Sequence, residues 1–294
     1  MPLAQSLWTM TESRIERGAR RQHPMHDHAE LFAGTASYYA RYRRGYSPDL
    51  PEAFAQLCEL DGRGRLLDLG TGTGALALAL AHLVEAGIAV DSDNAMLSEG
   101  SRIAKSRGID NIQFVHSRAE DLDQTIGTFR LITVGSAFHW MDRARILDFA
   151  YDALEPSGVF TLLAGPRAEI DPSESALPPI PWDRVQAVIT RYLGAKRRAG
   201  RGVYSAPDER YEDLLDGSKF GGHHTLTLPG SPTTRTVDEV IGYLYSTSYA
   251  SRRLFGERAA AFEAELRQEL LGISSTGEFS EAPVRTEIIY SRRA

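Results

Sequence analysis

Three glycines and two aspartates in the first third of the chain have the types and the spacing of a nucleotide-binding turn. Asp68 lies near the end of an apolar run, and Gly70, Gly72 and Gly74 follow it at every second position. A second apolar run ends at Asp91. Glycine lets a backbone turn tightly after a strand and approach a ligand closely. An acid at the tip of the next strand can bind both hydroxyls of a ribose. The pattern therefore predicts a ligand that contains a nucleoside.

The glycine pattern alone leaves two classes of ligand open. Gly70, Gly72 and Ala75 also satisfy the G-x-G-x-x-A form of the dinucleotide fingerprint. A carboxylate at Asp68, which we expect at the mouth of the turn, would repel a pyrophosphate and attract an ammonium or sulfonium group. S-adenosylmethionine has both cations and no phosphate, so charge favours it. Asp91 does not discriminate, because both classes of ligand contain a ribose.

The elements that must position these residues alternate between strand and helix. Strands are expected at 65–69, 88–91, 112–116, 129–134, 159–164, 225–228 and 286–290. The helix that follows the glycine turn is expected to end at Gly87. This alternation predicts an α/β fold, a Rossmann-like doubly wound seven-stranded sheet closed by an antiparallel strand. Ligands of such sheets bind beyond the carboxyl ends of the strands, so the tips of the first and fourth strands should meet at the site.

Five segments, in the expected order, resemble the motifs of one enzyme family. They are D-L-G-T-G-T-G at 68–74, A-V-D at 89–91, R-A-E-D-L at 118–122, S-A-F-H-W at 136–140 and L-E-P-S-G at 154–158. The family is the class I S-adenosylmethionine-dependent methyltransferases, in particular their small-molecule, type 11-like branch. The resemblance implies S-adenosylmethionine as the cofactor and methyl transfer as the reaction.

The resemblance also implies a set of residues around the cofactor. In relatives, a Tyr and an Arg from a segment like Y-x-R-Y-R close over the cofactor and meet its methionine carboxylate, which points to Tyr39 and Arg43. Arg44 stands where relatives have proline. The implied cofactor-binding residues are Tyr39, Arg43, Asp68, Gly70, Thr71, Gly72, Gly74, Asp91, Ser92, Met96, Ala119, Glu120 and Ser136.

The loop at 118–122 is the part of this set with an open alternative. In the family it passes the adenine edge, which places Ala119 and Glu120 there. Arg118 departs from the pattern, because many relatives have an aspartate at this position. Glu120, Asp121 or a water could therefore meet the adenine amine, and a surface ion pair of Arg118 with Asp121 is the competing structural interpretation.

Methyl transfer needs a protein that excludes water, aligns the acceptor and removes a proton where the acceptor is a hydroxyl or a protonated amine. His139, just beyond the fourth strand, is the candidate base, because an imidazole titrates near neutral pH. The alternative is that it orients Trp140 or bonds to the backbone. Trp140, Tyr243 and Tyr249 are candidates for acceptor binding, although aromatic side chains can equally pack in a core. His223 and His224 are less favoured bases, because they precede an edge strand.

Composition narrows the function classes. The chain has 294 residues, and its net charge of −6 argues against broad contact with nucleic acid. Its single cysteine, Cys58, excludes an internal disulfide and is expected to be a buried core thiol. No apolar run approaches the roughly 20 residues of a membrane span, and no signal peptide is evident, so we expect a cytoplasmic monomer or homodimer without a membrane partner.

We expect three regions. Residues 1–28 form a mobile arm, where three histidines (His23, His26, His28) do not amount to a metal site. Residues 29–165 form the cofactor-binding core. Residues 166–294 complete the sheet and add lid insertions at about 166–205 and 231–272.

The favoured function is methyl transfer to an O or N atom, or less favourably a C atom, of a small-molecule acceptor, in specialised metabolism for example. The alternatives are a nicotinamide-dependent oxidoreductase and a non-methylating protein that keeps the cofactor fold.

Overall fold

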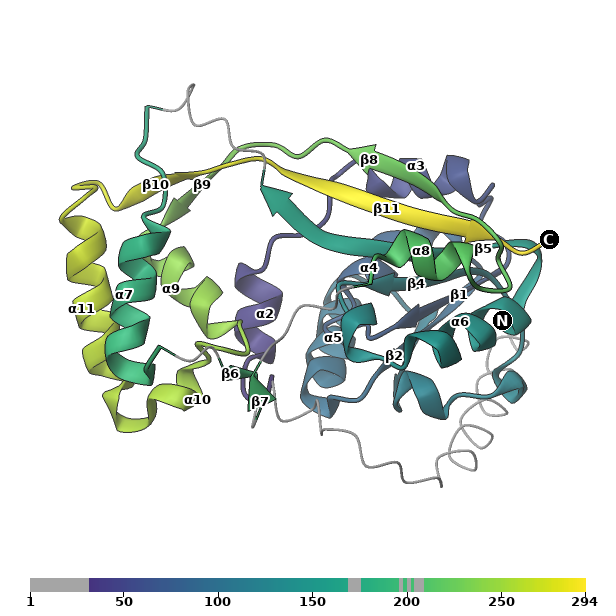
Figure 1. Cartoon of the computed structure of the whole chain (residues 1–294), viewed down its shortest axis with the longest axis horizontal. Coiled ribbons are helices and arrows are strands. Elements are labelled where there is room, and N and C mark those ends of the chain that lie inside the picture. The colour runs from purple at the N-terminus through teal and green to yellow at the C-terminus, as the bar shows by residue number, and fades with distance from the viewer. Residues whose placement is uncertain (1–31, 169–175, 196–197, 200–201, 204–208) are drawn as a thin grey trace.

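The computed structural model describes residues 32–168, 176–195, 198–199, 202–203 and 209–294. Figure 1 shows these residues as two lobes, a core built on a large sheet and a smaller lobe of helices, which we call the cap lobe. The expected arm at 1–28 lies outside the described residues. In the part of the chain that is described, no helix is long and apolar enough to cross a membrane, and no group of three potential metal ligands occurs.

The core sheet has seven strands in the order β3-β2-β1-β4-β5-β11-β8. Neighbouring strands from β3 to β5 are parallel, whereas β11 runs antiparallel to both β5 and β8. This confirms the predicted doubly wound sheet with an antiparallel strand. The bounds are β1 (Arg65–Leu69), β2 (Ala86–Asp91), β3 (Ile112–His116), β4 (Phe129–Gly135), β5 (Leu154–Ala168), β8 (His224–Leu228) and β11 (Val284–Arg292).

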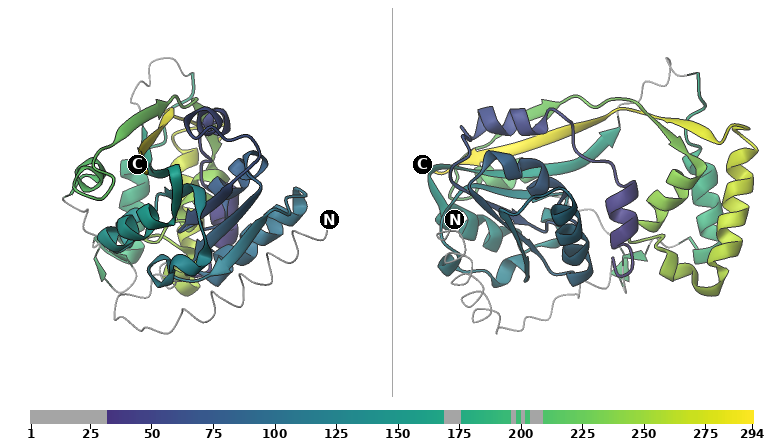
Figure 2. Two further views of the ribbon diagram at one scale, coloured as in Figure 1. Left: turned by 90° about the vertical axis from the view of Figure 1, so that its right-hand side faces the viewer. Right: turned by 180° about the vertical axis from the view of Figure 1, so that it is seen from behind.

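Helices cover both faces of this sheet (Figure 2). They are α3 (Leu50–Leu57), α4 (Ala75–Leu80), α5 (Asn94–Ser106), α6 (Arg143–Ala153) and α8 (Tyr211–Asp216). Burial on both faces explains the apolar strands. Leu67 and Leu69 belong to one hydrophobic cluster, and Leu66 belongs to the cluster on the other face. Cys58 is buried in the second cluster, as expected, and burial raises the pKa of its thiol to about 12.

The region after the glycine turn differs from the prediction. Helix α4 ends at Leu80, a 3-10 turn follows at Ala81–Leu83, and β2 begins at Ala86 rather than at Ile88. Gly87 is a strand residue and not a helix terminator. A Cβ atom at this position would lie 2.5 Å from Cδ1 of Ile112 on β3, so the Ile112 side chain packs in the space that the glycine leaves open.

The cap lobe has its own hydrophobic core. Its elements are α7 (Trp182–Leu193), α9 (Val237–Tyr245), α10 (Arg252–Phe255), α11 (Ala259–Leu271) and the two-stranded sheet of β9 (Thr233–Thr236) and β10 (Glu278–Glu281). Phe255, Phe262 and Phe279 are almost completely buried within it. A further pair of short strands, β6 (Arg198–Ala199) and β7 (Gly202–Val203), forms a separate small sheet. Helix α2 (Ala36–Tyr42) lies between the two lobes (Figures 1 and 2).

Candidate functional site

The glycine turn after β1 needs its glycines for two reasons. All three have a positive φ, which is 65° at Gly70, 57° at Gly72 and 77° at Gly74. A Cβ atom on Gly70 would also lie 2.5 Å from the Cβ of Ala137, in the loop that follows β4. The turn therefore packs directly against the tip of β4, which places the ends of the first and fourth strands side by side as the topology predicts.

A backbone hydrogen bond fixes Asp91 against this turn. The N–H of Gly72 donates to Oδ2 of Asp91 across 2.7 Å, and the N–H of Asp93 donates to Oδ1 across 2.9 Å. Burial raises the pKa of Asp91, and these backbone donors act in the opposite direction. The carboxylate is thus held in one orientation at the edge of the pocket described next.

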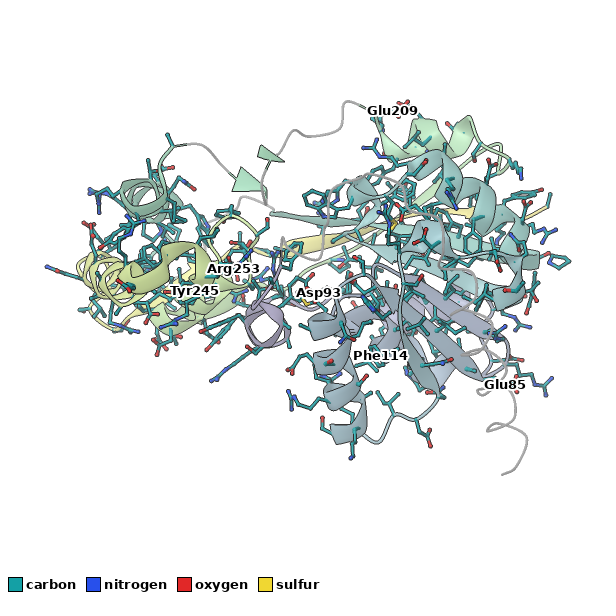
Figure 3. The ribbon with its side chains drawn as sticks, turned by 90° about the horizontal axis from the view of Figure 1, so that it is seen from below. Glu85, Asp93, Phe114, Glu209, Tyr245 and Arg253 are labelled. Atoms are coloured by element: carbon teal, nitrogen blue, oxygen red, sulfur yellow. The ribbon has the colours of Figure 1, made fainter. Side chains whose placement is uncertain are left out.

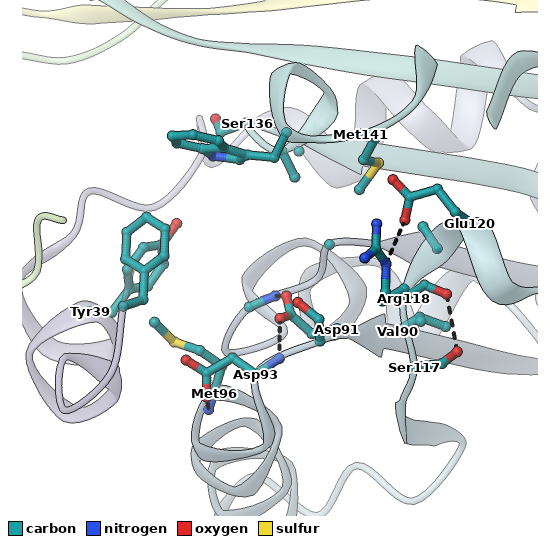
Figure 4. Close-up of a pocket in the computed structure, with 18 residues that line it drawn as sticks. Tyr39, Val90, Asp91, Asp93, Met96, Ser117, Arg118, Glu120, Ser136 and Met141 are labelled. Atoms are coloured by element: carbon teal, nitrogen blue, oxygen red, sulfur yellow. Dashed lines mark hydrogen bonds and ion pairs between the residues drawn. The ribbon is translucent and has the colours of Figure 1, made fainter. Parts of the chain in front are cut away.

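A pocket that is partly open to solvent lies at the carboxyl ends of β1, β2 and β4 (Figure 4). Its position, at the ends of neighbouring parallel strands, is where doubly wound sheets bind their ligands. The lining residues are Phe32, Tyr39, Gly70, Gly72, Val90, Asp91, Ser92, Asp93, Met96, Ser117, Arg118, Ala119, Glu120, Gly135, Ser136, Ala137, Trp140 and Met141.

Acidic side chains outnumber basic ones in the wall of this pocket. Asp93 caps α5 through Oδ1, which accepts from the N–H groups of Ala95 and Met96. Its Oδ2 is buried without a partner among the described residues. In Figure 3, Asp93 lies at the edge of the core that is turned toward the cap lobe. A buried, unneutralised carboxylate favours a ligand with positive charge.

Glu120 and Arg118 meet each other in the pocket wall. Nε of Arg118 lies 3.6 Å from Oε2 of Glu120, and Oε1 of Glu120 accepts from the N–H of Asp142 across 3.0 Å. The arginine therefore pairs with Glu120 and not with Asp121, the partner that the sequence suggested. Glu120 is partly committed to the start of α6, although it still lines the pocket.

Asp68 is not at the mouth of the turn, and our expectation of its position was wrong. Its side chain is 1% exposed and lies under the turn, where it accepts from Oγ1 of Thr71 across 2.5 Å and from Oγ1 of Thr133 across 2.6 Å. Burial raises the pKa of Asp68 to about 6, and the two hydroxyl donors oppose that rise. Asp68 thus supports the turn from below. The acids in the pocket wall are Asp91, Asp93 and Glu120.

The tip of β4 is strained where it meets the pocket. Ser136 has a φ of 53°, a left-handed conformation that is uncommon for a residue with a side chain. Such outliers concentrate at functional sites. A 3-10 turn, Phe138–Trp140, follows and places Trp140 in the pocket wall. The ring of His139 lies 4.6 Å from that of Trp140, but His139 is not among the residues that line the pocket.

Tyr39 covers the glycine turn from α2. Its Cε1 atom lies 4.0 Å from the position of a Cβ on Gly72, and its ring packs edge-on against Phe32. Arg43 lies between Tyr39 and the cap lobe. Its Cζ lies 5.1 Å from the Tyr39 ring and 5.2 Å from the Tyr243 ring, and its Nε donates to Oγ of Ser246.

Most of the site residues that the sequence predicted line the pocket, but not all of them do. Those outside its lining are Arg43, Asp68, Thr71, Gly74, His139, Tyr243 and Tyr249. Lining residues that were not among the predicted site residues are Phe32, Val90, Asp93, Ser117, Arg118, Gly135, Ala137 and Met141. Position within or next to a motif was the available signal for most of these. Phe32 precedes every motif and gave no signal.

Comparison with known proteins points to one family. The family described as "Methyltransferase domain" matches residues 66–158. A Dictyostelium discoideum protein named "Putative methyltransferase" is 21% identical over 219 residues, which cover 74% of this chain and 77% of the relative.

Two solved structures are also similar. One is described as precorrin 8w decarboxylase of Methanobacterium thermoautotrophicum. It is 15% identical with a TM-score of 0.49, and the alignment covers 86% of this chain and 94% of that protein's chain. The other is a "Putative Type II Methyltransferase" from Anaeromyxobacter dehalogenans. It is 22% identical with a TM-score of 0.48, and the alignment covers 86% of this chain and 97% of that protein's chain.

The matched segment, 66–158, contains the glycine turn, Asp91 and the strained tip of β4, and these residues surround one pocket. The sheet order is that of a doubly wound nucleotide-binding fold. The chain therefore carries a class I S-adenosylmethionine-dependent methyltransferase domain, and the protein is an enzyme that uses S-adenosylmethionine as its methyl donor.

Proposed function

We propose that this enzyme transfers the methyl group to an O or N atom of a small-molecule acceptor that enters between the core and the cap lobe. The charge of the pocket supports the cofactor on which this proposal depends. Asp91 and Asp93 leave the pocket wall acidic, while the one arginine in that wall pairs with Glu120. Such a wall suits a cofactor with a sulfonium and an ammonium group and no phosphate.

The hydrogen bond between Gly72 and Asp91 weighs against the nicotinamide alternative. In dinucleotide-binding folds the backbone of the glycine turn approaches a pyrophosphate. Here the N–H of Gly72 already donates to Oδ2 of Asp91, so it is not available to a pyrophosphate. A methyl donor without phosphates does not need this donor.

We propose cofactor contacts for the residues that line the pocket. The carboxylate of Asp91 would accept from the ribose hydroxyls, Met96 and Ala119 would flank the adenine, and Tyr39 would cover the methionine part. When bound, the cofactor supplies an activated methyl group. The protein then has to exclude water and align the acceptor, which the aromatic side chains of Tyr39, Phe32 and Trp140 support by enclosing the pocket.

We further propose that His139 accepts the acceptor's proton. It lies beside Trp140 at the tip of β4, next to the pocket rather than in its wall. We propose Trp140 as a contact for the acceptor. Tyr243, packed against Trp182 with ring centroids 5.8 Å apart, and Tyr249 would extend that surface into the cap lobe.

A screen with labelled S-adenosylmethionine tests the acceptor class. Purified enzyme is incubated with phenols, carboxylic acids, amines and small nucleophilic heterocycles, and the products are identified by mass spectrometry. We expect methylation at oxygen or nitrogen. Transfer to carbon alone, or to RNA or protein alone, would contradict the proposal. Cofactor binding without transfer to any of these classes would favour a non-methylating role.

A further inference from the structure

Helix α2, which covers the cofactor turn, is attached closely to the cap lobe. The Tyr42 ring packs on the bare backbone of α9 at Gly242. A Cβ atom on Gly242 would lie 2.4 Å from two carbons of that ring, Cδ2 and Cε2. Any side chain at residue 242 would therefore push α2 away from α9, because the ring and the helix backbone are both rigid.

Polar contacts reinforce this attachment. Nη1 of Arg235 donates to the carbonyl oxygen of Tyr42 across 2.8 Å, and Nε of the same arginine lies 2.6 Å from Oε2 of Glu281. Arg235 is 8% exposed, so it is held in a largely buried position. Nε of Arg43 donates to Ser246, just after α9, across 3.0 Å. Arg44, the next residue, donates to Oε2 of Glu281 and to the carbonyl oxygen of Ala282, each across 2.9 Å. The end of α2 is thus hydrogen-bonded to the cap lobe through three successive residues.

The neighbouring face of α2 belongs to the cofactor pocket. Tyr39 lies over Gly72, and it lines the pocket together with Phe32. Helix α2 has only seven residues, and so short a helix is held in place by tertiary contacts rather than by its own stability. It contacts α9 of the cap lobe and α5 of the core. Contacts with the cap lobe therefore contribute to the position of Tyr39.

We propose that Tyr42 and Gly242 are positioning residues for the cofactor, because they lock α2 against α9 and so hold Tyr39 over the glycine turn. Neither residue lines the pocket. Cofactor binding and placement of the cap lobe are then coupled, and the coupling is reciprocal, because each favours the same position of α2. The proposal rests on the cofactor alone and is independent of the acceptor proposed above.

The first test measures the dissociation constant of S-adenosylhomocysteine for Gly242→Ala. We expect at least tenfold weaker binding, although the substitution adds one methyl group outside the pocket. Gly272→Ala, at the end of α11 in the same lobe, is the matched control. Its Cβ would meet its nearest neighbours at 3.4 Å, an ordinary contact, and it should bind like the wild type. Wild-type affinity in Gly242→Ala with a folded, monodisperse protein would overturn the proposal.

Tyr42→Ala provides a second route that inserts no atom and so avoids a folding failure caused by a clash. It should also weaken binding of S-adenosylhomocysteine. In the double variant, Gly242→Ala should add little to the effect of Tyr42→Ala, because the methyl group has room once the ring is gone. Effects that multiply in the double variant would mean that the two residues act separately, and would overturn the proposal.

Hydrogen exchange can separate the proposed coupling from a general loss of stability, because it measures whether ligand binding protects the amides of α9. S-adenosylhomocysteine should slow amide exchange in α9 of the wild type, although no residue of α9 lines the pocket. The same ligand at saturation should leave α9 exchange unchanged in Gly242→Ala. Absence of protection in the wild-type α9 would contradict the coupling.

Discussion

The backbone N–H of Gly72 donates to Oδ2 of Asp91 across 2.7 Å, so the glycine turn of β1 is bonded to the tip of β2. This bond joins the two sequence features that first indicated a nucleoside site. It also orients the carboxylate before any ligand arrives. A preoriented acceptor loses less entropy on binding than a mobile one.

Replacement of Asp91 should therefore weaken cofactor binding strongly. Hydrogen bonds to a charged acceptor contribute about 1.5–3 kcal/mol each. We expect Asp91→Ala to raise the dissociation constant of S-adenosylhomocysteine by roughly tenfold to a hundredfold. Isothermal titration calorimetry measures this, with the exposed Asp110→Ala as the control. Equal affinities of the two variants would exclude a role for Asp91 at the ribose.

Substitution of Gly70 should be costly for two reasons that a control can separate. Gly70→Ala places a side chain on a residue with positive φ and brings its Cβ to 2.5 Å from the Cβ of Ala137. Gly108→Ala has a similar φ of 68° but open space around it, so it should lose only about 1–2 kcal/mol. Urea unfolding should show a larger loss for Gly70→Ala, together with weaker cofactor binding. Matching losses of stability would mean that the contact with Ala137 is unimportant.

The buried carboxyl of Asp68 should make stability depend on pH. Its pKa is about 6 in the folded protein and 3.8 in the reference state, so the folded state holds the proton more tightly. The stability from this group is complete below about pH 4 and is lost as the pH rises through about 6. About two pKa units correspond to an upper limit of about 3 kcal/mol.

Asp68→Asn removes this titration and is the variant for the measurement. Urea unfolding of both proteins between pH 4 and pH 8 should show that the wild type loses stability relative to the variant as the pH rises. The difference should level off above about pH 7. A difference that stays constant over this range would show that Asp68 does not titrate there.

The role of His139 as the base can be tested by measuring kcat and cofactor affinity separately. If it accepts the proton, His139→Ala should lower kcat at least a hundredfold for a hydroxyl or ammonium acceptor, with little change in the affinity for S-adenosylhomocysteine. The acidic limb of the kcat–pH profile should disappear as well. His82 lies in the 3-10 turn that follows α4 and does not line the pocket, so His82→Ala is the control. Unaltered turnover would remove His139 as the base.

Much of the core follows from periodicity and glycine placement. The predicted bounds of β1 and β3 agree with the structure, because each strand is a short apolar run between glycine or polar residues. The short α4 could not be predicted, because its alanine and leucine pattern continues through the 3-10 turn. Gly87 was misassigned because a glycine that packs against Ile112 and one that ends a helix look alike in sequence.

The candidate site was less predictable where contacts are distant in sequence. Asp68 points under the turn because the face it shares with Leu66 is covered by helices, and a strand buried on both faces gives no periodic signal of this. Arg43 donates to Ser246, 203 positions away, and Tyr42 packs on Gly242. These contacts depend on how the cap lobe folds back on α2, which no local pattern specifies.

The most direct test of the account is equilibrium binding of S-adenosylhomocysteine and NADH to the wild-type protein, each measured alone and in competition. S-adenosylhomocysteine keeps the nucleoside and the ammonium group of the methyl donor, so we predict that it binds saturably with one site per chain and is not displaced by NADH at millimolar concentration. Tight binding of NADH, with S-adenosylhomocysteine unable to compete, would contradict it.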